Sequence, residues 1–136
     1  MPKMVLTAEY VSVNAVDISS YLKKGEIAVE VDPQDVTTYA SAGWKEFLGG
    51  LKSGELGLSY LNDVAAAALD SIMWPLLGTV VAFEVRASQA VVGTSNPKYT
   101  GSILVKEWKP IGGSVGDANG ADVSYPTSAA VTRATA

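Results

Sequence analysis

The chain has 136 residues, a formal net charge of −4 and 48% hydrophobic residues. This length and composition indicate one globular domain with a sizeable core rather than a disordered chain. The sequence contains no cysteine and no histidine, which excludes disulfides, thiolate metal sites and catalysis by a histidine base. A slightly acidic chain is also poorly suited to non-specific binding of phosphates.

Neither a membrane span nor an export signal is expected. No run of the sequence reaches the roughly 20 apolar residues that cross a bilayer. Residues 1–10 are too short and too polar for a signal peptide. We therefore expect a cytoplasmic protein that makes no membrane contact.

Alternating residues predict strands at 9–14, 25–32 and 51–61. In the second of these strands the acids Glu26, Glu30 and Asp32 lie on one face, and the aliphatic residues Ile27, Val29 and Val31 lie on the other. We expect a turn at 23–25 before this strand, and Asp32 with Pro33 to end it.

Residues 35–50 lack a regular pattern. Residues 35–39 are β-branched and short, which favours an edge strand or an extended loop. Residues 40–50 mix small residues with Trp44 and Phe47, and we interpret them as a mobile loop with aromatic anchors.

One helix is predicted, at about residues 63–74. Asn62 or Asp63 provides an N-cap, and an alanine run with high helix propensity follows. Pro75 and then Gly78 end the helix. The apolar stripe that should pack on the core consists of Ala65, Leu69, Ile72 and Leu76, with Met73 beside it.

The remaining sequence predicts four more strands, at 79–86, 99–108, 121–125 and 130–134. Residues 110–120 are rich in glycine and predict a mobile loop. The sum is a mainly β protein, a β-sandwich or small barrel with one flanking α-helix. It forms a single domain over residues 1–136, with a short N-terminal arm.

The sequence offers no set of residues typical of an active site, a metal site or a cofactor site. Its carboxylates are scattered, and the loop at 112–117 lacks the spacing of a phosphate-binding loop. We therefore expect no enzyme and no cofactor. Trp44, Trp74 and Trp108 are compatible with a sugar-binding platform, but core packing or subunit contact is the favoured interpretation.

Several short motifs, taken in order, resemble the tail-tube (major tail) proteins of long-tailed bacteriophages, especially small ones from phages of actinobacteria and related hosts. No single motif is specific; the resemblance rests on their order and spacing and covers most of the chain from about residue 9. The motifs are VDISSY at 16–21, DVTTY at 35–39, GWKEFLGGLKSG at 43–54, WPLLGT at 74–79, NPKYTG at 96–101, PIGGSVGD at 110–117 and a terminal VTR.

The resemblance implies a structural virion protein whose subunits form hexameric rings. The rings stack into a tube, and DNA passes transiently through its lumen. Expected partners are other copies of the chain and the tape-measure, tail-terminator and tail-tip proteins, with assembly in the host cytoplasm. The alternatives are a tube protein of a contractile injection or secretion system, a capsid decoration or head–tail joining protein and, in a different class, a monomeric carbohydrate-binding β-sandwich.

Two groups of surface residues follow from this resemblance. A lumen wall should be acidic or neutral so that DNA slides without sticking, and the clearest acid row is Glu26, Glu30 and Asp32. An outer, solvated face is an equally good interpretation of that row. The candidates for contact between subunits are Trp44, Phe47, Trp108, Val115 and Asp117.

Overall fold

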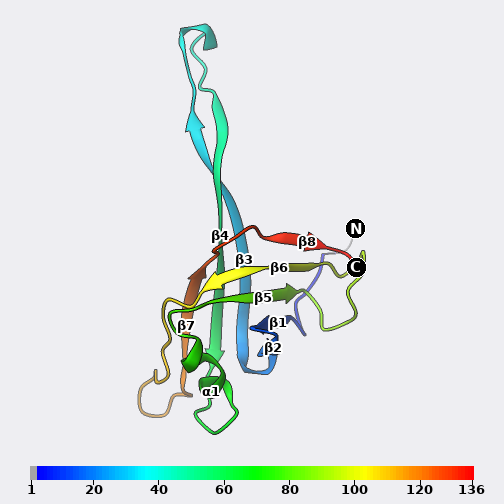
Figure 1. The fold of residues 1–136 in the computed structure, drawn as a ribbon, viewed down its shortest axis with the longest axis vertical. Helices are drawn as coiled ribbons and strands as arrows, with labels where there is room; N and C mark the ends of the chain where they lie inside the picture. Colours follow the sequence, from blue (N-terminus) through cyan, green and yellow to red (C-terminus); the bar gives the residue numbers. More distant parts are fainter. Residues whose placement is uncertain (1–2) are drawn as a thin grey trace.

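The computed structural model describes residues 3–136, and its strands form two antiparallel sheets with one short helix near one end of the molecule (Figure 1). One sheet has the order β2-β1-β5-β6-β8, with β1 at Tyr10–Val13, β2 at Val16–Asp17, β5 at Val80–Arg86, β6 at Lys98–Leu104 and β8 at Thr132–Ala134. The other has the order β3-β4-β7, with β3 at Leu22–Asp35, β4 at Phe47–Leu61 and β7 at Gly120–Pro126. The predicted mainly β architecture with one flanking helix is confirmed.

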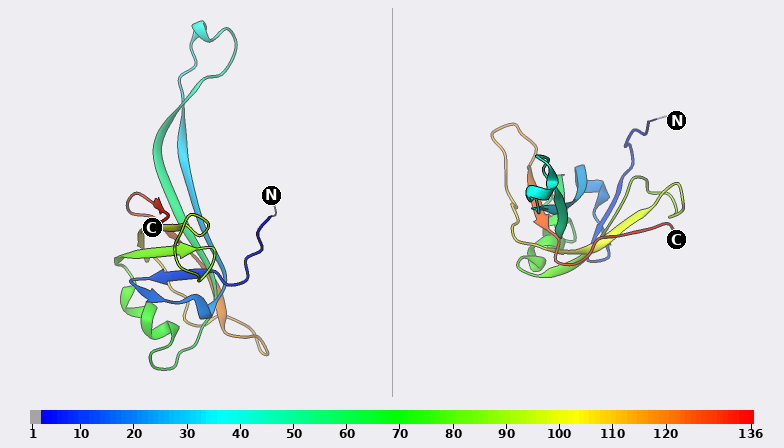
Figure 2. Two further views of the ribbon diagram at one scale, coloured as in Figure 1. Left: turned by 90° about the vertical axis from the view of Figure 1, so that its right-hand side faces the viewer. Right: turned by 90° about the horizontal axis from the view of Figure 1, so that it is seen from above.

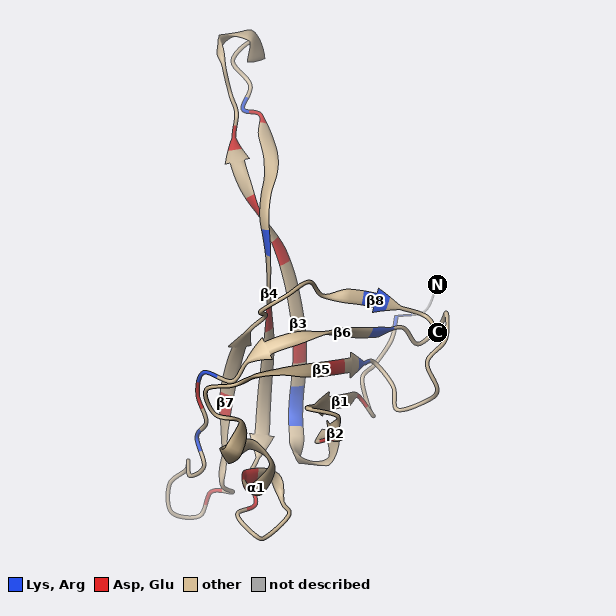
Figure 3. Cartoon of the chain, in the orientation of Figure 1, with Lys and Arg blue, Asp and Glu red and all other residues tan. Residues whose placement is uncertain are grey.

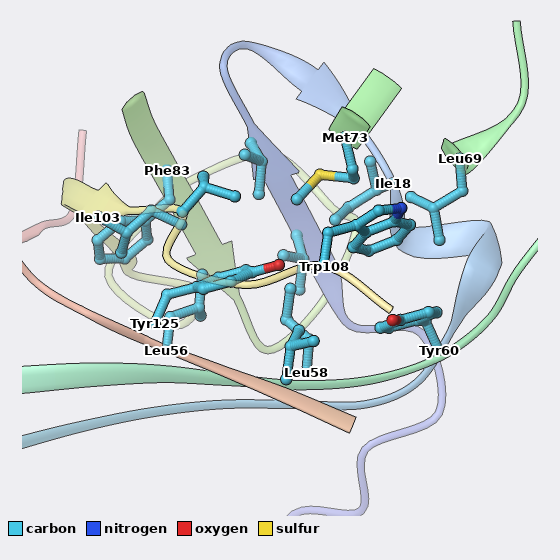
Figure 4. Close-up of a cluster of buried hydrophobic side chains, with 14 of the residues drawn as sticks. Ile18, Leu56, Leu58, Tyr60, Leu69, Met73, Phe83, Ile103, Trp108 and Tyr125 are labelled. Atoms are coloured by element: carbon cyan, nitrogen blue, oxygen red, sulfur yellow. The ribbon is translucent and has the colours of Figure 1, made fainter. Parts of the chain in front are cut away.

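The core lies between the two sheets and at their helical end (Figure 4). Strand β4 buries Leu56, Leu58 and Tyr60 on one face, and β5 buries Phe83 and Val85. Together with residues from the other strands, from α1 and from the segments between elements, these side chains form one contiguous cluster. Its further buried members are Val11, Val13, Ile18, Leu69, Met73, Ile103, Val105, Trp108, Val123 and Tyr125.

Strands β3 and β4 form a hairpin that is much longer than predicted, and its far half projects from the sandwich (Figures 1 and 2). We call residues 28–53 the arm: each of them is exposed except Ser41. The expected turn at 23–25 and the strand end at 32–33 are wrong. Register shifts at Leu22/Lys24 and at Val31/Pro33 absorb these residues within β3.

The aliphatic face of β3 is covered only at the base of the hairpin. Ile27 packs against the core, but Val29 and Val31 are 57% and 45% exposed and do not face it. The physical reason is that the arm has no second layer, so neither of its faces is covered. Residues 47–50, predicted as loop, belong to β4, and the hairpin tip is residues 36–46, which include the short 3-10 helix η2 at Tyr39–Ser41.

The helix is shorter than predicted: α1 spans Leu69–Met73 and continues as the 3-10 helix η3 at Trp74–Leu76. Asp63 does not cap a helix, because its side chain accepts a hydrogen bond from the Ala65 N–H at 2.9 Å within a turn. Ala67 has a left-handed φ of 64°, which no helix interior allows. Local side-chain bonding thus overrides the helix propensity of the alanine run.

Around this short helix, Leu69 and Met73 are 1% exposed, and Ile72 and Leu76 pack against the core from its margin. Ala65, predicted on the same stripe, is exposed because it lies in the turn before the helix. A further 3-10 helix, η1, occupies Ser19–Tyr21. No helix within residues 3–136 is long and apolar enough to cross a membrane.

Candidate assembly surfaces

The tip of the arm is held by its own hydrogen bonds. Thr37 donates its backbone N–H to Asp35 Oδ1 at 2.9 Å and accepts the Glu46 N–H on its hydroxyl at 2.8 Å. Thr38 and Ser41 cap one another across η2. The hydrogen bonds from Thr37 lower the pKa of the Asp35 carboxyl, so this carboxylate stays charged and keeps accepting them.

This ordered tip presents large apolar side chains to solvent. Tyr39 is 107% exposed, Trp44 is 79% exposed and Phe47 is 55% exposed. An open groove runs between Tyr39 and Trp44, with Thr37, Thr38, Gly43 and Lys45 along it. Two of the predicted contact residues, Trp44 and Phe47, are thus on a surface that nothing in the protomer covers.

The opposite end of the long axis also exposes apolar side chains, but from different elements. They lie around α1 and the loop at 110–120, at the bottom of Figure 1. They are Leu61, Val64, Trp74, Ile111 and Val115, which are 42%, 62%, 57%, 83% and 106% exposed. The molecule therefore has two unlike apolar ends, which is the arrangement that head-to-tail contacts require.

The loop at 110–120 is closed by hydrogen bonds. Asn119 accepts the Gly112 N–H at 2.8 Å and donates to Pro110 O at 3.0 Å, and Asp117 accepts the Ser114 N–H at 3.0 Å. Val115 at its far turn and Asp117 are both exposed. Its mobility in the free subunit stays a prediction.

The outer face of the β3-β4-β7 sheet is small and polar. Adjacent rows of this face contain Lys24, Ser59 and Asp122, and then Glu26, Gly57 and Ser124. Lys24 pairs with Glu26 at 3.4 Å, and the Ser59 hydroxyl donates to Asp122. The Lys24–Glu26 pair offsets part of the surface charge, and Gly57, Ser59 and Ser124 leave the middle of the face with small side chains.

The acids on this face are not quite the predicted row. Glu26 and Glu30 lie along it through unbroken pairing with β4, and the register places Glu55 of β4 and Asp122 of β7 on the same face. Figure 3 shows where acidic residues occur along these strands. Asp32 lies at the register shift of the arm, where its carboxylate accepts a hydrogen bond from Gln34 at 2.9 Å. Sequence alone did not associate Glu55 and Asp122 with this face, because strand pairing brings them there.

Trp108, predicted as a subunit contact, lies inside the protomer, and that prediction is wrong. It is 9% exposed, stacks on Tyr60 with the ring centroids 4.6 Å apart, and donates its Nε1–H to Asp70 at 2.9 Å (Figure 4). Trp44 and Trp74 lie at opposite ends of the molecule. The three tryptophans therefore form no common platform.

The segment that carries Trp108 runs from residue 105 to residue 112, and we call it the strap. Its residues 105–108 were predicted as the end of a strand, but the ladder of β6 stops at Leu104. Side chains hold the middle of the strap: the Tyr60 hydroxyl donates to Lys109 O at 2.8 Å, and the Tyr125 hydroxyl donates to Glu107 O at 2.9 Å. Burial raises the pKa of both tyrosines, so each hydroxyl keeps its proton.

Among residues 3–136, no group of three or more acidic, histidine or cysteine side chains is placed to hold a metal ion.

Comparisons with known proteins found similarity in three-dimensional structure and none in sequence. No family model matches the sequence, and no curated protein sequence matches it either. Several chains of solved structures are similar, including the following two. A chain of the "Virion of native gene transfer agent (GTA) particle" matches with a TM-score of 0.73 and 17% identity, over 92% of this chain and 94% of that one. A chain of the "Tail of empty GTA particle computed with helical refinement, C6 symmetry" matches with a TM-score of 0.67 and 17% identity, over 92% of each chain. At this identity the likeness shows the fold.

Proposed function

We propose that this protein is a structural virion protein of a phage-like tail: the tail-tube subunit, which forms stacked hexameric rings whose lumen conducts DNA during ejection. The observation that carries the proposal is the arm, a long hairpin that is exposed on both faces. The fold likeness supports it, because one of the similar structures is a tail with C6 symmetry and the match spans 92% of both chains. A structural role without catalysis fits the same neighbours.

The arm adds little to the stability of a free protomer. An isolated two-stranded hairpin is marginally stable in water, and this one exposes Leu48, Leu51 and Val29 at 63%, 85% and 57%. Exposed apolar surface of this extent is typical of a contact with another molecule. Because the far end of the body exposes a different apolar surface, we place the arm of one copy against the body of the next copy along the tube.

The outer face of β3-β4-β7 is the candidate lumen wall. Glu26, Glu30, Glu55 and Asp122 make it acidic, with Lys24 as a neighbouring base that is already paired. An acidic wall repels passing phosphates over a range of about 8–10 Å at physiological salt. A basic wall would bind them and release counterions, which gives strong and salt-dependent adhesion.

Tape-measure, tail-terminator and tail-tip proteins are the other partners of such a subunit, and assembly would take place in the host cytoplasm. The alternatives in the same structural class are a tube protein of a contractile injection or secretion system and a head–tail joining or capsid decoration protein. Each of them would use the same surfaces. A monomeric sugar-binding module is disfavoured because Trp44, Trp74 and Trp108 do not share a surface.

Negative-stain microscopy of the purified protein over a concentration series tests the proposal, together with light scattering. We expect rings or tubes with sixfold symmetry. A protein that remains monomeric at high concentration and forms neither rings nor tubes would refute the assembly.

The lumen is tested separately with particles that carry Glu26→Lys and Glu30→Lys. We expect them to assemble and to eject DNA more slowly than the parent, because the added ammonium groups bind phosphates. Glu26→Gln with Glu30→Gln is the matched control, which removes the acids without adding positive charge. Assembled lysine particles that eject at the parental rate would place this face outside the lumen.

A further inference from the structure

The two edges of the β3-β4-β7 sheet differ in how they meet solvent, and β7 forms one of them. The Thr127 N–H donates to Gly54 O at 3.0 Å, and the ladder continues from there in register. In an antiparallel ladder, successive residues bond to opposite sides. The backbone groups of Gly120, Asp122 and Ser124 therefore point away from β4, toward the open side of β7.

The strap bonds three of these outward groups: the Asp122 carbonyl, the Ser124 N–H and the Gly120 N–H. Lys109 donates its Nζ to Asp122 O at 3.0 Å, and Glu107 Oε1 accepts the Ser124 N–H at 3.4 Å. The Gly120 N–H bonds Gly112 O at 3.1 Å. Pro126, the next outward residue, has no N–H to offer. Two charged side chains and a proline thus protect this edge in place of a strand.

The β3 edge has no comparable protection. In the described part of the chain, β3 has β4 as its strand partner and no other. Val29 pairs with Gly54, whose carbonyl points to β7, so the backbone groups of Val29 point outward along the arm. A charged cap on an edge hinders strand addition there, so β3 is the edge of this sheet that stays open to a second chain.

We propose that Glu107 and Lys109 form a removable polar cap on β7, which withholds this edge from the β3 edge of a second copy. Strand addition requires the backbone groups at Asp122 and Ser124, and the cap occupies the Asp122 carbonyl and the Ser124 N–H in the free subunit. The cap therefore delays the joining of neighbouring subunits until the strap shifts. This inference rests on the proposed assembly, and it adds a control over when assembly begins.

The test compares Glu107→Ala with Lys109→Ala, singly and together, against the parent. Hydrogen exchange in the monomer should become about tenfold faster at the Ser124 amide when Glu107 is removed, because its acceptor is lost. In sedimentation and light scattering, the double variant should associate at a several-fold lower concentration than the parent. Glu107→Gln keeps an acceptor oxygen and should behave as the parent does. Lys106→Ala, an exposed neighbour in the strap, is the second control.

A proline in β3 identifies the edge that is used. Val29→Pro removes an outward N–H without touching the bonds to β4, so in the double-variant background it should restore the parental association. Thermal melts establish whether each variant is folded. If the double variant is not folded, the association of Lys109→Met is measured in its place. A folded double variant that exchanges and associates like the parent would overturn the cap. A parent that forms no rings, beside a double variant that associates more readily, would instead refute the tube and leave the cap standing.

Discussion

The arm and the body share the strands β3 and β4, yet the same type of side chain has opposite fates in them. Leu51 and Leu56 both lie in β4; Leu51 is 85% exposed on the arm and Leu56 is fully buried in the body. The difference is the presence of a second sheet, which covers one face of the hairpin only near its base. Apolar residues in the body therefore stabilise the fold, and those in the arm are available for contacts with other molecules.

The largest expected effect comes from this matched pair of leucines. Leu56→Ala should lower the free energy of unfolding by about 2–5 kcal/mol, because it leaves a cavity between the sheets. Leu51→Ala should change it by less than about 0.5 kcal/mol, since the side chain is already in solvent. Urea denaturation of both variants measures the contrast. Equal losses would mean that the arm is folded against the body in solution.

Two tryptophans sharpen the same contrast. Trp108→Phe keeps the stacking on Tyr60 but removes the donor to Asp70, and should cost about 1–2 kcal/mol of stability. Trp44→Phe should leave the melting temperature unchanged, which thermal denaturation of both variants will measure.

Trp44→Ala then separates assembly from stability. If the arm tip is a central contact, this substitution should raise the concentration needed for association about tenfold or more while the melting temperature stays parental. Light scattering gives the first quantity and calorimetry the second. Parental association of a folded Trp44→Ala protein would remove the tip from the interface.

The loop at 110–120 is expected to be mobile in the free subunit and ordered in the tube. Fixing its backbone costs about 1–2 kcal/mol per residue, which contacts with a neighbouring subunit would have to offset. Hydrogen exchange should be slower in tubes than in monomers at residues 113–118, beyond the hydrogen bonds of Asn119. Equal protection in the two forms would place the loop outside the interface.

The smallest expected effect concerns Glu9, at the base of the hairpin. Its carboxyl lies over Gly25, in a pocket that Lys23 and Lys24 also line, and burial raises its pKa above the ordinary 4.5. The folded state thus binds this proton more tightly than the unfolded state does. The resulting stability is fully present below pH 4.5 and is lost as the pH rises through the raised pKa. Denaturation at several pH values should show this decline in the parent and not in Glu9→Gln.

Local patterns in the sequence determined much of the fold. Local sequence patterns identified the strands β4, β5 and β7, and Pro75 with Gly78 ended the helical segment close to where it stops. These features depend on neighbours in the chain, so the sequence is sufficient to predict them. The absence of cysteine and histidine likewise follows from the sequence alone.

The rest depended on which elements meet in space. Only the tertiary structure decided that Val29 and Val31 leave the body, since a strand pattern does not say how far the opposing sheet extends. It also decided that Trp108 turns inward to Asp70, and that Glu55 and Asp122 join Glu26 on one face. Pairing between strands that are distant in the sequence sets these positions, so a local pattern does not reveal them. The hydrogen bond to Asp63 that accompanies the shortened helix is a second contact that helix propensity did not predict.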